Sequence, residues 1–460
     1  MPAKPFSVTD AFQWIESFHN SEKTGGYDDR TYRLERMEEL CRLFKDPQKS
    51  FKSVHIAGSK GKSSTACYIA SILEKCGLKT GLYTSPHLLD YRERISLSGK
   101  PFSDGAYTEA VGSIKRKKSE ILKLPVFAEM APTVFELLTL TAFLIFRNEK
   151  CDYAVIETGL GGRLDATNVI IPRISVLTPI EKEHVEILGD TLAKIAFEKG
   201  GIIKPNIPVQ SSEQEAEVKA VLDEIGFRKN SEISYLPDSI EKIDVDISAE
   251  GTRFTAAPKT GPTETYTLPN IGEVFARNAA LAVLTVRQLS VIDMIETATA
   301  SVIQNTLASA FIPGRFQIID RTPTVVIDPA HTPRSVKNTA DTFKKVIKGK
   351  RILIFAAAKD KNTEEIAAAV GKSFSSVIVT AFRGFKSSDG DRDFRAFQAV
   401  NRKTVFEPDP EKALQTARDL LSKSGKKGTA EGGILITGSF YLISRFLKQE
   451  EACSLNSFPG

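Results

Sequence analysis

Residues 53–65, SVHIAGSKGKSST, decide the fold that we expect for this chain. Residues 53–57 are typical of a short buried strand, residues 58–62 of a tight glycine loop, and Ser63 of the first residue of a helix. A loop placed before a helix N-terminus directs backbone N–H groups and the positive end of the helix dipole at one point, and Lys62 adds a charge there. The stretch therefore predicts an anion site, and the usual guest of such a site is a nucleoside triphosphate.

The loop departs from the full phosphate-loop pattern G-x-x-x-x-G-K-[ST], because only two residues separate Gly58 from Gly61. An ordinary glycine turn before a helix is therefore the alternative interpretation. The apolar strand before the loop and the helical spacing after it favour the phosphate site.

Length and composition are those of a soluble globular protein. The 460 residues can bury a large core in about two or three domains, with 41% hydrophobic and 26% charged residues. A net charge of +5 suits an anionic small molecule better than a nucleic acid. The five cysteines contain no C-x-x-C pair, and neither a membrane-spanning run nor a signal peptide is visible. We therefore expect a cytoplasmic monomer with small-molecule substrates and no nucleic-acid or membrane partner.

Strands and helices alternate along most of the chain. We expect strands at 79–83, 152–157 and 174–177, helices at 132–148, 191–199 and 273–289, and a β excursion at 240–268. The alternation restarts after Pro313 and Gly314, with strands at 324–328, 351–356, 376–380 and 434–437. Such alternation indicates parallel sheets that bind ligands at the carboxyl ends of their strands. The prediction is an α/β protein with a phosphate-loop, parallel-sheet ATP-binding domain over 1–309, a smaller Rossmann-like α/β domain over 310–450 and a tail at 451–460.

Several polar residues follow expected strands. Glu157 ends a buried strand, where a carboxylate can order a magnesium ion, although it could instead cap the next turn. Ser85 could be a second magnesium ligand, whereas the phosphate-loop pattern nominates Ser63, and the residues alone leave both open. Lys199 lies at a helix C-terminus, where a cation is already explained by the helix dipole. Three histidines also follow strands: His87, His184 and His331.

Taken in order, these motifs resemble the folylpolyglutamate synthase/dihydrofolate synthase family of the Mur ligase superfamily. The resemblance covers most of the chain, and its most distinctive part is ETGLGGRLDATN at 157–168. The other strings that carry it are AGSKGKSS at 57–64, SPHL at 85–88, EKGGIIK at 198–204, NAA at 278–280, PGR at 313–315, DPAH at 328–331 and TGS at 437–439.

The resemblance implies a role for each of these motifs. For the catalytic step it implies Lys62, a carbamylated Lys199 that supports a metal, and His331 near the incoming glutamate. A pair of magnesium ions would be held by Ser85, Glu157 and His184. The implied ATP-binding residues are Gly58, Ser59, Lys60, Gly61, Lys62, Ser63, Ser64, Asn278, Arg315 and Asp328. The implied substrate-binding residues are His87, Arg94, Thr133, Val134, Phe135 and Glu136, with Phe135 as the residue that stacks on a pterin.

The implied activity is an ATP-dependent ligase. It would join a pterin or folate carboxylate to L-glutamate through an acyl phosphate, with the two domains closing at a hinge over 309–313. Two departures from the family pattern, Ser63 for a glycine and Thr332 for an asparagine, leave open a catalytically weakened ATP-binding switch protein. A cell-wall Mur-type amino-acid ligase is the other alternative, and the string at 157–168 argues against it.

Overall fold

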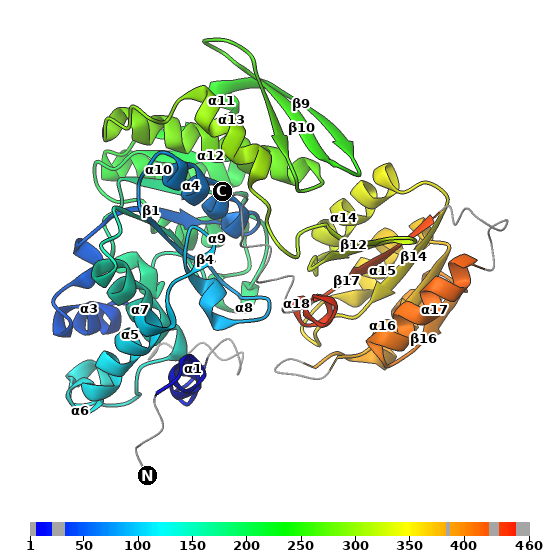
Figure 1. Cartoon of the computed structure of the whole chain (residues 1–460), viewed down its shortest axis with the longest axis horizontal. Coiled ribbons are helices and arrows are strands. Elements are labelled where there is room, and N and C mark those ends of the chain that lie inside the picture. Colours follow the sequence, from blue (N-terminus) through cyan, green and yellow to red (C-terminus); the bar gives the residue numbers. More distant parts are fainter. Residues whose placement is uncertain (1–5, 21–32, 383–386, 423–431, 448–460) are drawn as a thin grey trace. The chain divides into compact units, whose positions relative to one another are not determined.

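The computed structural model describes residues 6–20, 33–382, 387–422 and 432–447, so the expected tail at 451–460 lies outside the described residues. The chain divides into two compact units. Unit 1 contains Met1–Asp244, Thr255–Tyr266 and Arg277–Ala310, and unit 2 contains Val245–Phe254, Thr267–Ala276 and Phe311–Gly460. The elements of both units are labelled in Figure 1.

Unit 1 is built on an eight-stranded sheet in the order β4-β3-β2-β5-β1-β6-β7-β8. The strands from β2 to β8 in this order run parallel, while β3 and β4 add an antiparallel edge. The loops that leave the carboxyl ends of the parallel strands therefore meet at one edge of the sheet. The strands are β1 (Lys52–Ala57), β2 (Thr80–Tyr83), β3 (Ile95–Leu97), β4 (Lys100–Pro101), β5 (Tyr153–Glu157), β6 (Ile174–Leu177), β7 (Val209–Ser211) and β8 (Ile233–Tyr235).

Helices cover both faces of this sheet. α1, α3, α5 and α7 share one apolar core with strand residues such as Tyr83 and Ile156, and α4 packs on β1, β2 and β5. Figure 1 shows α4 and α7 on opposite sides of β1. The helices are α1 (Val8–Glu16), α3 (Leu34–Leu43), α4 (Lys62–Lys75), α5 (Asp104–Arg116), α6 (Lys118–Ile121), α7 (Val134–Asn148), α8 (Val185–Leu188), α9 (Leu192–Gly200), α10 (Ala216–Lys229), α11 (Leu236–Ser239), α12 (Glu273–Ile292) and α13 (Ala300–Ser309).

The expected β excursion is a three-stranded sheet in the order β11-β10-β9. Its strands are β9 (Ile240–Ser248), β10 (Gly251–Pro258) and β11 (Glu264–Leu268). Along β10, buried and more exposed positions largely alternate, which is the period expected for a sheet with one covered face.

Unit 2 has a six-stranded sheet in the order β12-β13-β17-β14-β15-β16, in which β12 alone is antiparallel to its neighbour. The central strands β13, β14, β15 and β17 are almost fully buried, as expected for a parallel sheet covered on both faces. The elements are β12 (Gln317–Arg321), β13 (Thr324–Asp328), α14 (Pro333–Val346), β14 (Lys350–Phe355), α15 (Thr363–Val370), β15 (Ser376–Val379), α16 (Gly390–Val400), β16 (Thr404–Phe406), α17 (Pro410–Ser422), β17 (Gly432–Thr437) and α18 (Phe440–Ile443).

The predicted α/β class, with its parallel sheets, is confirmed. The long apolar strands and the helices with a clear period lie within a few residues of their expected bounds. The sequence did not indicate β3, β4 or β16, because each has only two or three residues and lies at or near a sheet edge.

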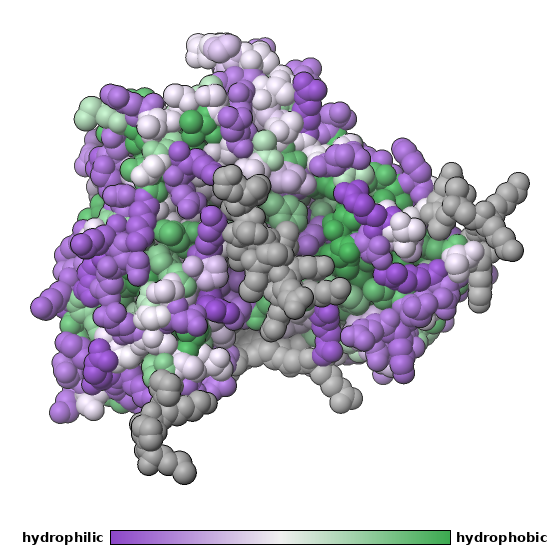
Figure 2. Space-filling view, in the orientation of Figure 1, coloured by the Kyte–Doolittle hydropathy of each residue, from purple (hydrophilic) through white to green (hydrophobic). Residues whose placement is uncertain are grey.

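The molecular surface near α3, α5 and α6 is mainly hydrophilic on the face that Figure 2 shows. Lys115, Arg116 and Lys118, at the end of α5 and the start of α6, are exposed. None of the helices within the described ranges is long and apolar enough to cross a membrane.

Candidate active site

The loop between β1 and α4 needs glycine at two positions. Gly58 and Gly61 have φ angles of +148° and +86°, in the region that side chains rarely adopt. A Cβ atom at Gly58 would lie 1.9 Å from Thr178 Oγ1, and a Cβ atom at Gly61 would lie 2.5 Å from Asn278 Oδ1. The loop is thus packed closely on the end of β6 and on α12, and the structure brings Asn278, an expected ATP-binding residue, onto it.

Ser59 ties the same loop to the segment that follows β6. Its backbone N–H donates to Pro179 O over 2.8 Å, and its hydroxyl donates to Glu181 O over 3.0 Å. In return, the backbone N–H of Glu181 donates to Ser59 Oγ over 2.9 Å. Ser59 therefore shapes the loop through its side chain, while α4 begins at Lys62 and directs its first N–H groups toward the loop.

Glu157 contacts residues of two loops at the candidate site. Its side chain is 2% exposed, Oε1 accepts a hydrogen bond of 3.0 Å from Ser63 Oγ, and Oε2 accepts one of 3.2 Å from the backbone N–H of Ser85. Lys62 Nζ lies 4.0 Å from Oε1 and donates to Gly58 O over 3.1 Å. One buried carboxylate at the end of β5 thus joins the phosphate loop to the loop after β2.

A second charged cluster, formed by Lys199, Glu183 and Lys60, also contacts the phosphate loop. Lys199 Nζ, 3% exposed, donates to Gly58 O over 2.8 Å and lies 3.1 Å from Glu183 Oε1. Lys60 Nζ lies 3.4 Å from the other carboxylate oxygen of Glu183. The position of Lys199 is therefore not explained by the dipole of its own helix alone, because its ammonium group contacts a carbonyl oxygen of the phosphate loop.

The electrostatics of this cluster follow from burial and from the excess of lysines. Burial, with a smaller contribution from Lys62, lowers the pKa of Lys199 to about 8 against the opposing effect of Glu183. Burial alone would raise the pKa of Glu183, but Lys199, Lys62 and Lys60 outweigh it and hold the pKa well below its usual range. Glu183 therefore carries a negative charge among three lysines at the phosphate loop.

The glycine turn after Glu157 is held by a buried aspartate. Asp165 Oδ2 accepts hydrogen bonds of 2.9 Å from the backbone N–H groups of Gly159 and Leu160. Its Oδ1 accepts one of 3.0 Å from the N–H of Thr167, and Thr167 Oγ1 lies 2.8 Å from Nε2 of the buried His55 in β1. Burial raises the pKa of Asp165, and the hydrogen bonds that it accepts fix the path of the turn.

On the expected acceptor side, the structure brings His87 and Arg94 together. Arg94, 3% exposed, donates from Nε to His87 Nδ1 over 2.9 Å, and the His87 ring lies 4.3 Å from the Tyr91 ring. Because Nδ1 accepts this hydrogen bond, the neutral ring carries its proton on Nε2.

The expected pterin contacts at 133–136 divide into two groups. Thr133 caps α7, Val134 is 2% exposed in the core, and Glu136 is 4% exposed with both oxygens engaged by Arg36. These three side chains make contacts within the protein itself, and their expected role as substrate contacts stays a prediction. Phe135 is different, because its ring lies against Gly159, where a Cβ atom would come within 2.4 Å of it. It remains the candidate for contact with a substrate ring.

The residues around Glu157 fit a magnesium ion. This hard cation prefers carboxylate and other oxygen ligands, takes one or two carboxylates from the protein, and completes its shell with water and phosphate oxygens. Glu157 and the Ser63 hydroxyl, 3.0 Å apart, supply such oxygens beside the phosphate loop. Within the described ranges, no cluster of three or more His, Cys, Asp or Glu side chains could hold a metal alone. His184 begins α8 directly after Glu183, with a φ angle of +50°.

In unit 2, the expected nucleotide and glutamate residues gather at the end of β13. Asp328 accepts hydrogen bonds of 2.9 Å from the backbone N–H groups of Phe316 and Ala330, so it shapes the loops on either side. His331 Nδ1 lies 2.9 Å from Pro329 O, an acceptor, and therefore carries the ring proton, which leaves Nε2 as the acceptor nitrogen. The Arg315 guanidinium lies 4.8 Å from the centre of the Phe440 ring.

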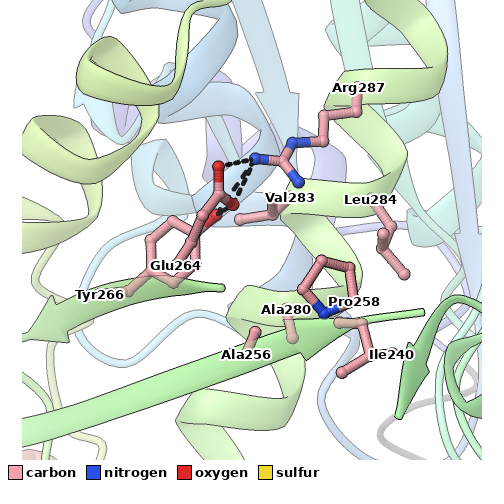
Figure 3. Close-up of a pocket in the computed structure, with 9 residues that line it drawn as sticks. All are labelled: Ile240, Ala256, Pro258, Glu264, Tyr266, Ala280, Val283, Leu284 and Arg287. Atoms are coloured by element: carbon pink, nitrogen blue, oxygen red, sulfur yellow. Dashed lines mark hydrogen bonds and ion pairs between the residues drawn. The ribbon is translucent and has the colours of Figure 1, made fainter. Parts of the chain in front are cut away.

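Figure 3 shows a separate small pocket of unit 1, between the β9–β11 sheet and α12. Its walls are mainly aliphatic, and its charged groups bind one another, since Arg287 pairs with Glu264 and Glu264 accepts from the Tyr266 hydroxyl. We interpret the pocket as imperfect packing under the sheet. Its lining residues are Ile240, Ala256, Pro258, Glu264, Tyr266, Ala280, Val283, Leu284 and Arg287.

Sequence reasoning missed the parts played by Glu183 and Arg36. Nothing in the local pattern places Glu183 next to Lys60, which lies far away in the sequence. Arg36 did carry a signal, because in the helix LERMEELCRL it lies four positions before the apolar Leu40, on the buried face. An arginine on such a face predicts a buried partner.

Comparisons with known proteins agree with this geometry. A family model described as "Mur ligase middle domain" matches residues 56–286, and one described as "Mur ligase, glutamate ligase domain" matches residues 314–440. The dihydrofolate synthase/folylpolyglutamate synthase of Bacillus subtilis (strain 168) is 32% identical over 90% of this chain and 94% of its own length. The folylpolyglutamate synthase of Lacticaseibacillus casei is 29% identical over 95% of this chain and 97% of its own.

Solved structures give the same result. A folylpolyglutamate synthase of Mycobacterium tuberculosis, complexed with ADP and AMPPCP, superposes with a TM-score of 0.83 at 28% identity. The match covers 96% of this chain and 99% of the other. The phosphate loop with its buried carboxylate, followed by a second parallel-sheet unit, defines an ATP-dependent ligase of the Mur type. Within that class, the chain belongs to the folylpolyglutamate synthase/dihydrofolate synthase family.

Proposed function

We propose that this ligase forms an amide between the carboxylate of a pterin-linked acceptor, either dihydropteroate or a reduced folate, and the α-amine of L-glutamate. An oxygen of the acceptor carboxylate attacks the γ-phosphorus of ATP, which gives an acyl phosphate and ADP. The amine then attacks the acyl carbon, phosphate leaves, and the amine loses its proton. The single observation that carries this proposal is the position of Glu157. Its carboxylate lies between Ser63, next to the phosphate loop, and Ser85, in the loop after β2.

The phosphoryl step depends on charge at the loop. Lys62 is 16% exposed, close enough to the surface to reach phosphate oxygens, and the N–H groups at the start of α4 add donors. Such groups stabilise the negative charge that spreads over the transferring phosphoryl oxygens. Magnesium held by Glu157 and by the hydroxyl of Ser63 or Ser85, with a second ion at His184, would neutralise further charge on the nucleotide when bound.

Lys199 is proposed to act as a carbamate. Carbamylation consumes the neutral amine, and burial favours that form by lowering the pKa of Lys199 to about 8. The modification would turn a cation beside Gly58 O into an anion that can support a metal ion. It would also require Glu183, now 3.1 Å away, to give up its contact with this side chain.

In unit 2, Arg315 and Asp328 are proposed to serve the adenosine part of the nucleotide. His331 is proposed to serve glutamate, because its acceptor nitrogen Nε2 can bind the ammonium group or receive its proton. Thr332 caps α14 through a hydrogen bond with Ser335, so the residue that departs from the family pattern is used structurally.

The test measures phosphate release by the purified full chain with ATP and Mg²⁺, with each acceptor and glutamate added singly and together. Release that requires both glutamate and dihydropteroate or tetrahydrofolate supports the proposal, and the two acceptors are assayed in parallel to assign the reaction. Nucleotide binding without such turnover would overturn the proposal in favour of a switch protein. Turnover with a uridine-linked muropeptide instead would overturn it in favour of a cell-wall ligase.

A further inference from the structure

Arg36 is a buried cation with several hydrogen-bond partners. Its side chain, on α3, is 2% exposed, and its guanidinium lies 4.6 Å from the centre of the Phe127 ring. All five N–H donors of an arginine are used here. Nε and Nη2 donate to the two carboxylate oxygens of Glu136 over 2.8 and 3.1 Å. The other three donate to the backbone oxygens of Val126 (3.0 Å), Met130 (3.0 Å) and Ala131 (2.9 Å).

These bonds shape a segment with little regular structure of its own. Between the short 3₁₀ turn Pro125–Phe127 and the cap of α7 at Thr133, the chain has neither a helix nor a strand to fix its path. One planar, forked guanidinium binds two carbonyl groups of this segment, those of Met130 and Ala131, and the carbonyl group of Val126 in the 3₁₀ turn. A lysine could not reproduce this pattern, because its ammonium is a point charge with three donors and no fork.

The same arginine orients the first turn of α7. Glu136 Oε2 accepts hydrogen bonds from both the backbone N–H (2.7 Å) and the hydroxyl (3.0 Å) of Thr133, which closes a capping box. Arg36 holds the same carboxylate from the other side. The backbone of Phe135 lies inside this clamped turn, so the direction of its ring is set by Glu136 and Arg36.

The ring of Phe135 points to the candidate active site. It packs against Gly159 in the turn after Glu157, and its centre lies 6.0 Å from the centre of the Tyr83 ring at the end of β2. A small rotation of the first turn of α7 would therefore move the Phe135 ring, which lies near the carboxylate of Glu157. Stacked and edge-on ring contacts depend strongly on such geometry.

Stability alone is a weak reason for this ion pair. Burying two charges costs desolvation energy, and apolar side chains of similar volume often replace such a pair without loss. What apolar side chains could not reproduce is the pattern of hydrogen bonds to three backbone carbonyls and to the capping box.

We propose that Arg36 is a positioning residue that sets the affinity for the ring-bearing acceptor. It acts through the 126–131 segment and through Phe135, without touching the acceptor or the nucleotide. This inference rests on the proposed function, since the acceptor is taken to carry a pterin ring.

The test compares the full-length wild type with Arg36→Lys and with the double variant Arg36→Met/Glu136→Leu, which replaces the pair by apolar residues and protects the fold. Steady-state kinetics give KM for dihydropteroate, tetrahydrofolate, ATP and glutamate, and calorimetry gives Kd for ADP. Both variants should raise the acceptor KM about tenfold, while KM for ATP and glutamate and Kd for ADP change less than twofold. Arg147→Met is the matched control, because Arg147, near the other end of α7, also binds a backbone carbonyl, that of Phe44.

Each outcome decides between explanations. An acceptor KM that stays at the wild-type value in both variants overturns the proposed role of Arg36 and leaves the proposed function intact. A parallel loss of ADP binding and of acceptor affinity also overturns it, because it shows a general loss of structure. If the wild type binds ADP but turns over neither pterin acceptor, the proposed function fails, and this inference fails with it.

Discussion

Ser63 Oγ donates a hydrogen bond of 3.0 Å to Glu157 Oε1. The serine lies in the first turn of α4, at the position where the family pattern has a glycine, and the carboxylate ends β5 with 2% of its side chain exposed. The residue that departs from the pattern is therefore a direct partner of the expected magnesium-ordering carboxylate. A side chain at this position need not crowd the loop, because it turns toward Glu157.

This contact predicts a magnesium phenotype for Ser63→Ala. A hydrogen bond to a charged group contributes about 1.5–3 kcal/mol, and its loss leaves Glu157 less well oriented. We expect the Mg²⁺ concentration for half-maximal ligation to rise about threefold to tenfold at saturating ATP, measured by titration of the rate. Ser113→Ala, a serine of α5 that bonds only its own helix in the structure, is the control. An unchanged magnesium dependence would argue against this role for Ser63.

Lys62→Ala should abolish ligation while the protein remains folded. The side chain lies at the start of a helix with 16% exposure, so its removal leaves no large cavity, but a phosphate contact is lost. We expect kcat/KM to fall by about a hundredfold or more, with an unchanged Tm. Lys79→Ala, which removes a half-exposed lysine paired with Glu149, should retain activity. Ligase activity retained in Lys62→Ala would refute the assignment.

The lowered pKa of Lys199 predicts how its carbamylation depends on pH. The neutral amine is the reactive form, and its share grows as pH rises through the folded pKa of about 8. We expect bicarbonate to add one carboxyl group to the wild type, seen by native mass spectrometry, more extensively at pH 9 than at pH 7. Lys199→Arg should show no such addition and little ligation. The same mass with and without bicarbonate at both pH values would rule the modification out.

Asp165→Asn should destabilise unit 1. The buried carboxylate accepts hydrogen bonds from three backbone N–H groups, those of Gly159, Leu160 and Thr167. An amide would turn an N–H₂ donor toward one of these donors, so we expect a loss of about 2 kcal/mol or more in the free energy of unfolding. Urea denaturation measures this loss, with the exposed Asp104→Asn as control. A loss below about 0.5 kcal/mol would mean that the turn does not depend on Asp165.

The sequence predicted best what depends on neighbouring residues. The strand at 174–177 and the helix after the phosphate loop were visible because apolar periodicity and glycine positions are local properties. The sequence did not reveal that Arg36, a hundred positions earlier, binds the carboxylate of Glu136, because no local pattern links residues so far apart in the chain.

By itself, the amino-acid sequence determined the α/β class, the anion-binding loop and the family to which the chain belongs. These follow from short strings whose spacing sets backbone conformation and helix dipoles locally. The tertiary structure alone decided which charges meet: Ser63 with Glu157, Lys199 with Glu183, and Arg36 with the segment before α7. The physical reason is that parallel pairing brings together the carboxyl ends of strands that are distant in the chain. Side chains that meet there are close in space but far apart in the sequence, so no local pattern predicts their contacts.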